Sequence, residues 1–428
     1  MIESGTETAK ATENFNLHFK RTNLRLIYAV ATVKKAAAQV YLSFGINPKI
    51  YAEIAKVCDE ICAGEYDDSF VVDALQGGAG TSTNMNVNEV IASIATERLG
   101  RSVHPIDDVN RGQSTNDVYP TALRIAAVNQ LRLLSDACAS LQESLQQREN
   151  EFESIKKLGR TELMDAVEIT LGSEFGSFAQ AISRDRWRLY KVEERLRQVN
   201  IGGTAVGRYD NAERKYRFAI IEKLRELTGI GLAEAEYPMD ITQNQDVFVE
   251  VSGLLKALAV NLMKIAGDIR LMASGPKGGL GEITLPELQK GSSIMPGKVN
   301  PVIPEMVIQC AIKVIANDAA VTMAASHGEF ELNAFMPLIA DSLLESLELL
   351  TKAVDIFNGK CIAILAPDKE RCEKILNESF SFATSYVPIL GYDFVSEAVK
   401  SGDSADKVRD ALEAAARKIE NDGGRNDE

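Results

Sequence analysis

The sequence predicts a mainly α-helical protein built around a bundle of long helices. The clearest sign is a stripe of apolar residues that runs from Val247 to Met272 with the spacing of one helix face. No proline interrupts this stretch, and Gly275 and Pro276 end it. A second apolar row, which includes Phe248, indicates that the helix is packed on more than one side and therefore lies inside a bundle.

Other stretches have the same helical periodicity, whereas strand signals are weak and short. One example of such a strand signal spans residues 167–171. Residues 404–428 predict a charged helix followed by a polar tail. Further long helices are expected at residues 21–44, 121–157, 172–198, 212–228, 301–325 and 336–357.

Composition narrows the possible functions. The chain has 428 residues, a length that suggests two or three domains. Apolar residues make up 45% and charged residues 25%, which excludes disorder as the main state. The formal net charge of −14 argues against a phosphate-backbone partner, so we expect no nucleic-acid binding. It does not argue against a small anionic metabolite, because a few local donors can bind one.

Histidine and cysteine usage argues against a metal centre. The three histidines, His18, His104 and His327, are too few for a multi-histidine site. The six cysteines lie in apolar, helix-like stretches without a CxxC pair, which is typical of reduced, buried thiols. We therefore expect no metal and a cytoplasmic protein. The first residues lack a signal-peptide pattern, and no apolar run reaches the roughly 18 residues of a membrane span, so we also expect no membrane association.

Polar segments precede three of the expected helices, at residues 80–86, 113–117 and 291–301. Each places small hydroxyl and amide side chains beside free backbone N–H groups at a helix start, an arrangement that binds carboxylates. Helix capping alone explains any one of them. Three in one chain, one with Lys298 in a glycine-flanked loop, favour a site for a polyanion. Neither the GxxxxGK[ST] pattern nor a GxGxxG pattern in a βαβ context is present, so no nucleotide cofactor is expected.

The stretch 291–301, GSSIMPGKVNP, resembles the signature loop of the aspartase/fumarase superfamily. The resemblance covers nearly the whole chain and includes residues 78–90, 104–117, 159–166 and 274–283. Two details, at residues 76–82 and 300–305, look more like the aspartate ammonia-lyase branch than the fumarase branch.

The resemblance implies a fold, an assembly and a reaction. The fold is a three-domain helical lyase, and we place its domains at residues 1–113, 114–369 and 370–428. The long helices form a bundle that is shared in a homotetramer, and each active site is built from three subunits. The reaction is a reversible anti-elimination of ammonia, or of a substituted amine, from L-aspartate or an aspartate-like substrate to give fumarate, without a cofactor. Alternatives are a fumarate hydratase or other superfamily lyase, and a non-catalytic structural or binding paralogue.

The resemblance also implies roles for individual residues. Ser292 matches the general base that removes a proton from the carbon beside a carboxylate, which creates a dianionic aci-carboxylate. Thr81, Ser114 and Thr115 match the donors around that carboxylate. Lys298 and Asn300 match the residues that hold the other carboxylate, and Thr161 matches a further carboxylate contact. Asn116 matches a contact near the leaving group, and His104 and Glu305 match accessory or structural positions.

Several positions depart from the family pattern. Glu162 stands where histidine or glutamine is usual, near the leaving group, and a carboxylate there attracts a protonated amine. Arg208 replaces a small residue and could pair with Glu162 or with an enlarged substrate. Lys10 replaces an arginine and loses bidentate carboxylate recognition. These departures suggest a paralogue that acts on an aspartate-like amine. We also expect the glycine-rich segment 275–281 to let the signature loop open and close.

Overall fold

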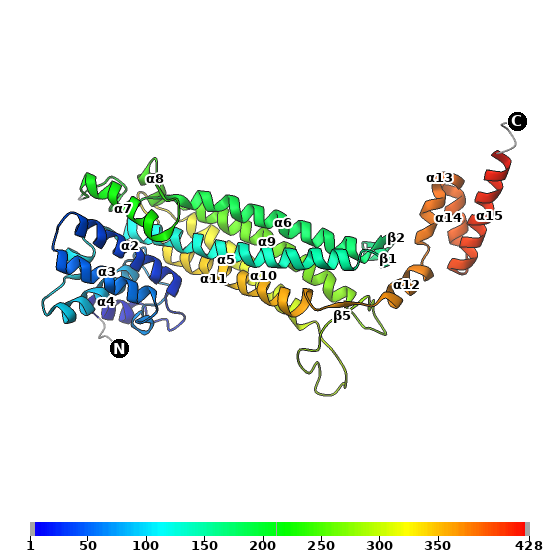
Figure 1. The fold of residues 1–428 in the computed structure, drawn as a ribbon, viewed down its shortest axis with the longest axis horizontal. Helices are drawn as coiled ribbons and strands as arrows, with labels where there is room; N and C mark the ends of the chain where they lie inside the picture. The colour runs from blue at the N-terminus through cyan, green and yellow to red at the C-terminus, as the bar shows by residue number, and fades with distance from the viewer. Residues whose placement is uncertain (1–4, 211, 424–428) are drawn as a thin grey trace. The chain divides into compact units, whose positions relative to one another are not determined.

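The computed structural model describes residues 5–210 and 212–423, and this part of the chain is mainly helical (Figure 1). The all-α prediction is therefore confirmed. The chain divides into two compact units, each made of three separate segments. Unit 1 comprises Met1–Ala137, Arg184–Val260 and Gln309–Ala353, and unit 2 comprises Cys138–Ser183, Asn261–Ile308 and Val354–Glu428. The three-domain division at residues 113/114 and 369/370 stays a prediction.

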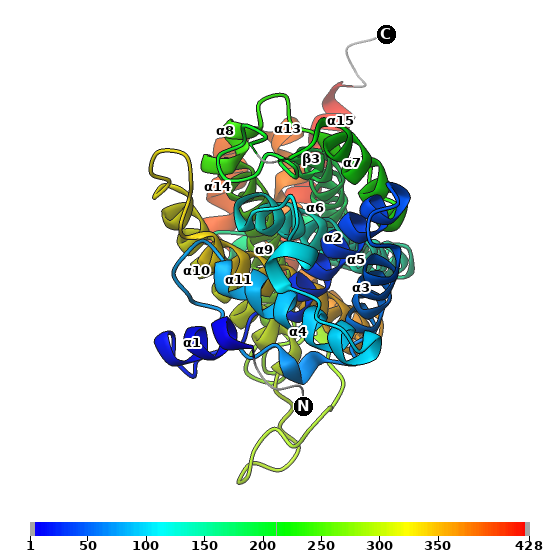
Figure 2. The same ribbon diagram turned by 90° about the vertical axis from the view of Figure 1, so that its left-hand side faces the viewer.

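The four N-terminal helices of unit 1 form a compact group in which the last three contact one another (Figure 2). Asn23 caps the second helix by accepting the backbone N–H of Arg25 at 2.8 Å, and Pro48 begins the third. The carboxylate of Glu89 holds the first helix, because it accepts the N–H groups of Glu7 and Thr8 at its start. The helices are α1 (Thr6–Asn14), α2 (Leu24–Ser43), α3 (Pro48–Cys62) and α4 (Thr81–Leu99).

Long helices account for most of the remaining chain, and the boundaries between the two units fall within them. The predicted apolar stripe is one helix face, with Leu258 and Leu262 fully buried, and Phe248 of the second row is buried as well. The helices expected at 301–325 and 336–357 are confirmed almost to the residue. The long helices are α5 (Thr115–Glu151), α6 (Leu171–Glu193), α9 (Asp246–Met272), α10 (Val302–Ala325) and α11 (Met336–Phe357).

The helix expected at residues 121–157 was placed wrongly at both ends. It begins at Thr115 and ends at Glu151, and the chain then forms strand β1 (Lys156–Thr161). This strand pairs antiparallel with β2 (Met164–Thr170), which covers most of the predicted strand at 167–171. The pairing explains the difference, because each strand supplies the backbone partners of the other and Leu158 is buried beneath the hairpin.

Short elements complete the two units. Strands β3 (Gln198–Val199) and β4 (Ala233–Glu234) pair in parallel, and β5 (Ile283–Thr284) pairs antiparallel with β6 (Ala366–Pro367). The C-terminal helices share a small core of Ala383, Val395, Val408 and Leu412. The remaining helices are α7 (Arg214–Thr228), α8 (Pro238–Gln243), α12 (Lys369–Glu378), α13 (Val387–Leu390), α14 (Tyr392–Ser401) and α15 (Ala405–Gly423).

Helix α10 is unusually apolar. Among the described residues it alone is long and apolar enough to cross a membrane, with a mean hydropathy of 1.4 over the relevant window. Length and composition are weak grounds for a membrane span, because the core helices of soluble proteins pass the same test. Only 33% of the window is buried within the chain, so α10 presents a large apolar surface.

Candidate active site

The starts of α4 and α5 lie against each other in unit 1, and they carry the first group of predicted site residues. Gly80 precedes α4 with a φ of 93°, and a Cβ atom there would lie 2.3 Å from the ring of Tyr119 on α5. The position therefore requires glycine for its conformation and for the close approach. Asn84 on α4 donates to the hydroxyl of Thr115 at 3.2 Å, so the predicted residues Thr81 and Thr115 stand at two joined helix N-termini.

A buried polar network supports these helix starts. Lys34 on α2 is fully buried, and its ammonium donates to the side-chain oxygens of Asn110 at 2.6 Å and Gln113 at 3.0 Å. The same Asn110 oxygen accepts from Asn84 and Asn88, at 3.1 and 3.2 Å. Burial lowers the pKa of Lys34 to about 7. The network thus links the core of unit 1 to the turn that presents Ser114, Thr115 and Asn116.

Asp117 fixes the same turn from the other side. Its carboxylate is fully buried and accepts the backbone N–H groups of Ser114, Gly202 and Thr204, at 2.9, 3.0 and 2.9 Å. Burial raises the pKa of Asp117 to about 7, although the three N–H donors and Lys34 oppose that shift. Asp117 consequently joins residues 202–204 to the start of α5.

Ser114 and Asn116 make local hydrogen bonds at the start of α5. The Ser114 hydroxyl accepts the N–H of Asn116 at 3.2 Å, so it caps the helix while its own proton stays available. Pro120 has no N–H with which to bond the carbonyl of Asn116, and Asn200 donates to that carbonyl instead, at 2.9 Å. The amide nitrogen of Asn116 donates to the carbonyl of Ala205 at 2.8 Å, which holds its side chain beside residues 202–205.

The accessory residues of unit 1 have simpler surroundings. His104 caps the turn that follows it, because its Nδ1 accepts the N–H groups of Ile106 and Asp107 at 3.3 and 3.1 Å. This geometry supports the structural interpretation of His104. Arg208 is exposed in the turn after Gly207.

Thr161 and Glu162 lie at the exposed end of the β1–β2 hairpin in unit 2. The connection has two residues, Glu162 and Leu163, with φ values of 55° and 65°. Two-residue turns of this kind favour Asn-Gly, because non-glycine residues in the left-handed region cost roughly 1–2 kcal/mol each. Glu162 and Leu163 do not stabilise this turn, and strained backbone positions of this kind cluster at functional sites.

The signature loop closes on itself between β5 and α10. The side chain of Asn300 donates to the carbonyl of Gly291 at 2.7 Å, which joins the two ends of the motif. A Cβ atom at Gly291 would lie 1.8 Å from the carbonyl oxygen of Lys298, so only glycine allows this approach. The Lys298 side chain is exposed.

Ser292 sits at the start of this closed loop. Its hydroxyl oxygen accepts two backbone N–H groups, from Ile294 at 3.1 Å and from Met295 at 3.0 Å. Two fixed donors aimed at one oxygen would stabilise negative charge on it. Glu305, the other acidic candidate of this region, pairs with Arg270 on α9 at 3.6 Å, which supports a structural role at the start of α10.

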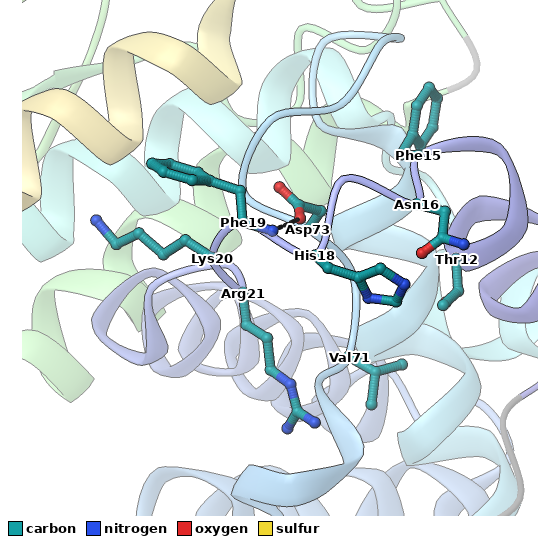
Figure 3. A pocket seen from close by; sticks show the side chains of 9 residues that line it. All are labelled: Thr12, Phe15, Asn16, His18, Phe19, Lys20, Arg21, Val71 and Asp73. Carbon is teal, nitrogen blue, oxygen red and sulfur yellow. Dashed lines mark hydrogen bonds between the residues drawn. The ribbon is translucent and has the colours of Figure 1, made fainter.

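A separate pocket of about 410 Å³ in unit 1 contains none of the predicted site residues. Figure 3 shows His18 and Asp73 among the side chains that line it, with Asp73 accepting the N–H of Phe19 at 3.1 Å. Lys20 lies at its edge and pairs with Asp341 at 2.7 Å. Within the described part of the chain, no group of three or more histidine, cysteine or acidic side chains could hold a metal ion.

Comparisons with known proteins decide the family. Residues 4–316 match a protein family described as lyase. Aspartate ammonia-lyase from Helicobacter pylori is 42% identical over 414 residues, which are 93% of this chain and 88% of that protein. The chain belongs to the aspartase/fumarase superfamily of lyases. A class II fumarate hydratase from Corynebacterium efficiens is 44% identical over 398 residues, 92% of this chain and 84% of that protein.

Solved structures of the superfamily share the fold over almost the full length. The fumarate lyase:delta crystallin of Brucella melitensis bound to cobalt has a TM-score of 0.92 and 43% identity, covering 98% of this chain and 96% of that one. The class II fumarase of Schistosoma mansoni also has a TM-score of 0.92, at 32% identity, with 97% and 92% covered. These likenesses confirm a helical lyase fold.

Sequence reasoning missed the buried charges around the superfamily motifs. The first group is Lys34, which donates to Asn110, and the buried Asp117. The second is Glu282 with Lys157. The Ser-x-x-Asp spacing of Ser114 and Asp117 was a readable capping signal. Lys34 and Lys157 gave no such signal, because a lysine between apolar residues usually extends its ammonium to solvent.

Proposed function

We propose that this chain catalyses the reversible elimination of ammonia from L-aspartate, or of an amine from an aspartate-like substrate, to give fumarate. It is a carbon–nitrogen lyase. The relatives named aspartate ammonia-lyase support this reaction, and the superfamily acts on small dicarboxylates. The observation that carries the residue assignment is the pair of N–H groups that the Ser292 oxygen accepts.

The Ser292 oxygen acts as the general base. With Ile294 and Met295 donating to it, the deprotonated oxygen is stable enough to accept a proton from the substrate carbon. An O–H bond forms, and the C–H electron pair moves onto the neighbouring carboxylate as an aci-carboxylate. That pair then forms the C=C bond while the amine leaves with the electrons of the C–N bond.

Other candidate residues bind the two ends of the substrate. Thr81, Ser114 and Thr115 supply hydroxyls and helix N-termini for the carboxylate that gains charge. Lys298 and Asn300 bind the other carboxylate, Thr161 is a further carboxylate contact, and Asn116 lies near the leaving group. Glu162 attracts the protonated amine and repels a carboxylate, so it favours an amine over a hydroxyl leaving group.

A homotetramer is the proposed assembly, with each active site built from three subunits. Support comes from the apolar surface that the chain leaves open, including Val260 on α9 and Ile312 and Met323 on α10, which are 52%, 52% and 64% exposed. Soluble proteins bury such helix faces in symmetric interfaces. Sedimentation of the purified protein should give four times the chain mass, whereas a monomer at catalytic concentrations would contradict this assembly.

The protein is proposed to be cytoplasmic. Cys58, Cys361 and Cys372 are free and buried, as expected for a reducing compartment. Cell fractionation tests this proposal, and recovery of the protein with membranes would contradict it.

A substrate panel tests the reaction. L-aspartate, malate and N-substituted aspartates are supplied in turn, and fumarate is followed by its ultraviolet absorbance. We expect fumarate from aspartate or from an N-substituted aspartate. Fumarate hydratase is the second candidate because the Corynebacterium relative is 44% identical, and robust turnover of malate alone would establish it instead. Fumarate from none of these substrates would support the non-catalytic paralogue.

A further inference from the structure

A buried cluster of charges in unit 2 surrounds Glu282, which none of the proposed chemical steps uses. Glu282 is 0% exposed and Lys157 on β1 is 1% exposed, and the Lys157 ammonium lies 2.7 Å from the Glu282 carboxylate. Arg160, also on β1, donates to the second oxygen of Glu282 at 2.9 Å. Lys157 further bonds Glu174 on α6 at 2.6 Å. Two cations from one strand therefore hold one buried carboxylate.

The backbone around Glu282 is held as firmly as its side chain. The Glu282 N–H donates to the carbonyl of Met272 at 2.8 Å, and its own carbonyl accepts the N–H of Asp368 at 2.8 Å. The guanidinium of Arg371 donates to the carbonyls of Gly279 and Leu280, both at 2.8 Å. The end of the glycine-rich segment is thus tied to the start of α12, and its glycines permit close backbone approach.

The cluster around Glu282 is close in sequence to two segments that carry proposed site residues. Ten residues after Glu282 comes Ser292, at the start of the loop that Asn300 closes. One residue after Arg160 comes Thr161, followed by Glu162 at the hairpin turn. A single buried carboxylate therefore joins the base of the loop that carries the proposed general base to the strand that presents the proposed amine contact.

We propose that Glu282 is a positioning residue that fixes the signature loop and the β1–β2 hairpin relative to each other. This inference rests on the function proposed for Ser292 and Glu162. Without the Glu282 charge, Lys157 keeps Glu174 as its partner, and Arg160 loses a charged partner. The hairpin and the base of the loop then move independently, so one substitution disturbs both proton abstraction and amine binding.

The test compares Glu282→Gln with a matched control. Glutamine keeps the size of the side chain and removes its charge. Lys156→Met is the control, because Lys156 precedes Lys157 on β1 but pairs with Glu168 of the same hairpin, at 2.8 Å, and does not reach Glu282. For both variants we measure kcat with aspartate, KM for the amine in the amination direction, and amide hydrogen exchange of residues 160–166 and 285–300.

Glu282→Gln should lower kcat by about tenfold or more and raise KM for the amine, while exchange increases in both segments. Lys156→Met should leave the kinetic constants within about twofold of the wild-type values. A Glu282→Gln protein with wild-type kcat, KM and exchange overturns the proposal. So does a protein that loses stability but keeps its kinetic constants, because that is a purely structural role.

Arg160→Met is a second variant for the same measurements, to be used if Glu282→Gln fails to fold. Arg160 is 16% exposed, so its loss is better tolerated, and Lys157 still pairs with Glu282. We expect the same changes with smaller amplitude, and unchanged kinetics and exchange overturn the proposal. Failure of the proposed function is distinguishable, because the wild-type protein would then release no fumarate, whereas the exchange of the two segments would still respond to Glu282→Gln.

Discussion

The hydroxyl oxygen of Ser292 accepts the backbone N–H of Met295 at 3.0 Å inside a loop that Asn300 closes. A second donor, the N–H of Ile294, lies 3.1 Å from the same oxygen. Serine is a poor base in water because its oxyanion is unstable there, and fixed donors reduce that instability. The proposed role of Ser292 as a base rests on these two backbone donors, whereas the Lys298 side chain of the same loop is exposed.

Asn300→Ala should impair catalysis strongly. The substitution removes the 2.7 Å hydrogen bond to the Gly291 carbonyl and one proposed carboxylate contact. We expect kcat/KM for aspartate to fall by roughly a hundredfold or more, as for other preorganised donors. Val299→Ala is the matched control because its side chain is 43% exposed in the same loop, and it should stay within about threefold. Equal effects of the two variants would contradict the role given to Asn300.

Glu162→Gln should weaken amine binding. The charge at the hairpin turn attracts the protonated amine, and loss of an interaction of about 1.4 kcal/mol raises KM for the amine about tenfold. Initial rates of amination with fumarate and ammonium measure this constant. Glu168→Gln is the control, since Glu168 is an exposed acid of the same hairpin that pairs with Lys156. An unchanged KM for the amine in Glu162→Gln would remove the main argument for an amine leaving group.

Lys34→Met should change the pH dependence of stability. Burial lowers the pKa of Lys34 to about 7 in the folded protein, from 10.5 in the unfolded chain. Between these values the unfolded chain binds more protons at Lys34, so this residue makes the free energy of unfolding rise with pH by up to about 1.4 kcal/mol per unit. Lys34→Met lacks that contribution and also loses the cation that opposes the raised pKa of Asp117.

Urea unfolding of both proteins at about pH 7 and about pH 9 checks this sign. The stability of the wild type minus that of Lys34→Met should increase between the two pH values. Lys35→Met is the control, because Lys35 is a neighbouring lysine of α2 that pairs with the exposed Asp59. A difference that stays constant or decreases with pH would contradict a neutral, buried Lys34 at high pH.

The helical fold was predictable because its signal is local. The apolar stripe of α9 repeats along the helix, and Phe248 of its second row is buried as expected. The residues of the signature loop were predictable for a different reason, since their resemblance to the superfamily covers an uninterrupted stretch. The first two residues of strand β1 were assigned to the end of a helix because their partners lie on β2 and cannot be read from the strand's own residues.

Buried charges were the least predictable part of the site. Lys157 and Glu282 are 125 positions apart in the sequence and so form no local pair. Only the folded hairpin brings the Lys157 ammonium to 2.7 Å from the Glu282 carboxylate. The same holds for Lys34 and Asn110, which come from α2 and from the turn before α5. The residues proposed to contact the substrate were named from contiguous motifs and stay a prediction, whereas the buried charges that support them depend on tertiary packing.

Replacement of Ser292 tests the central claim most directly. The rate of fumarate formation from the best substrate of the panel is measured for the wild type and for Ser292→Ala, with Ser293→Ala as the control for the neighbouring hydroxyl. Ser292→Ala should lose roughly a thousandfold in kcat, as expected for removal of a general base, and should keep the wild-type oligomeric mass. Ser292→Ala with more than about a tenth of the wild-type kcat would contradict the role of Ser292 as the base.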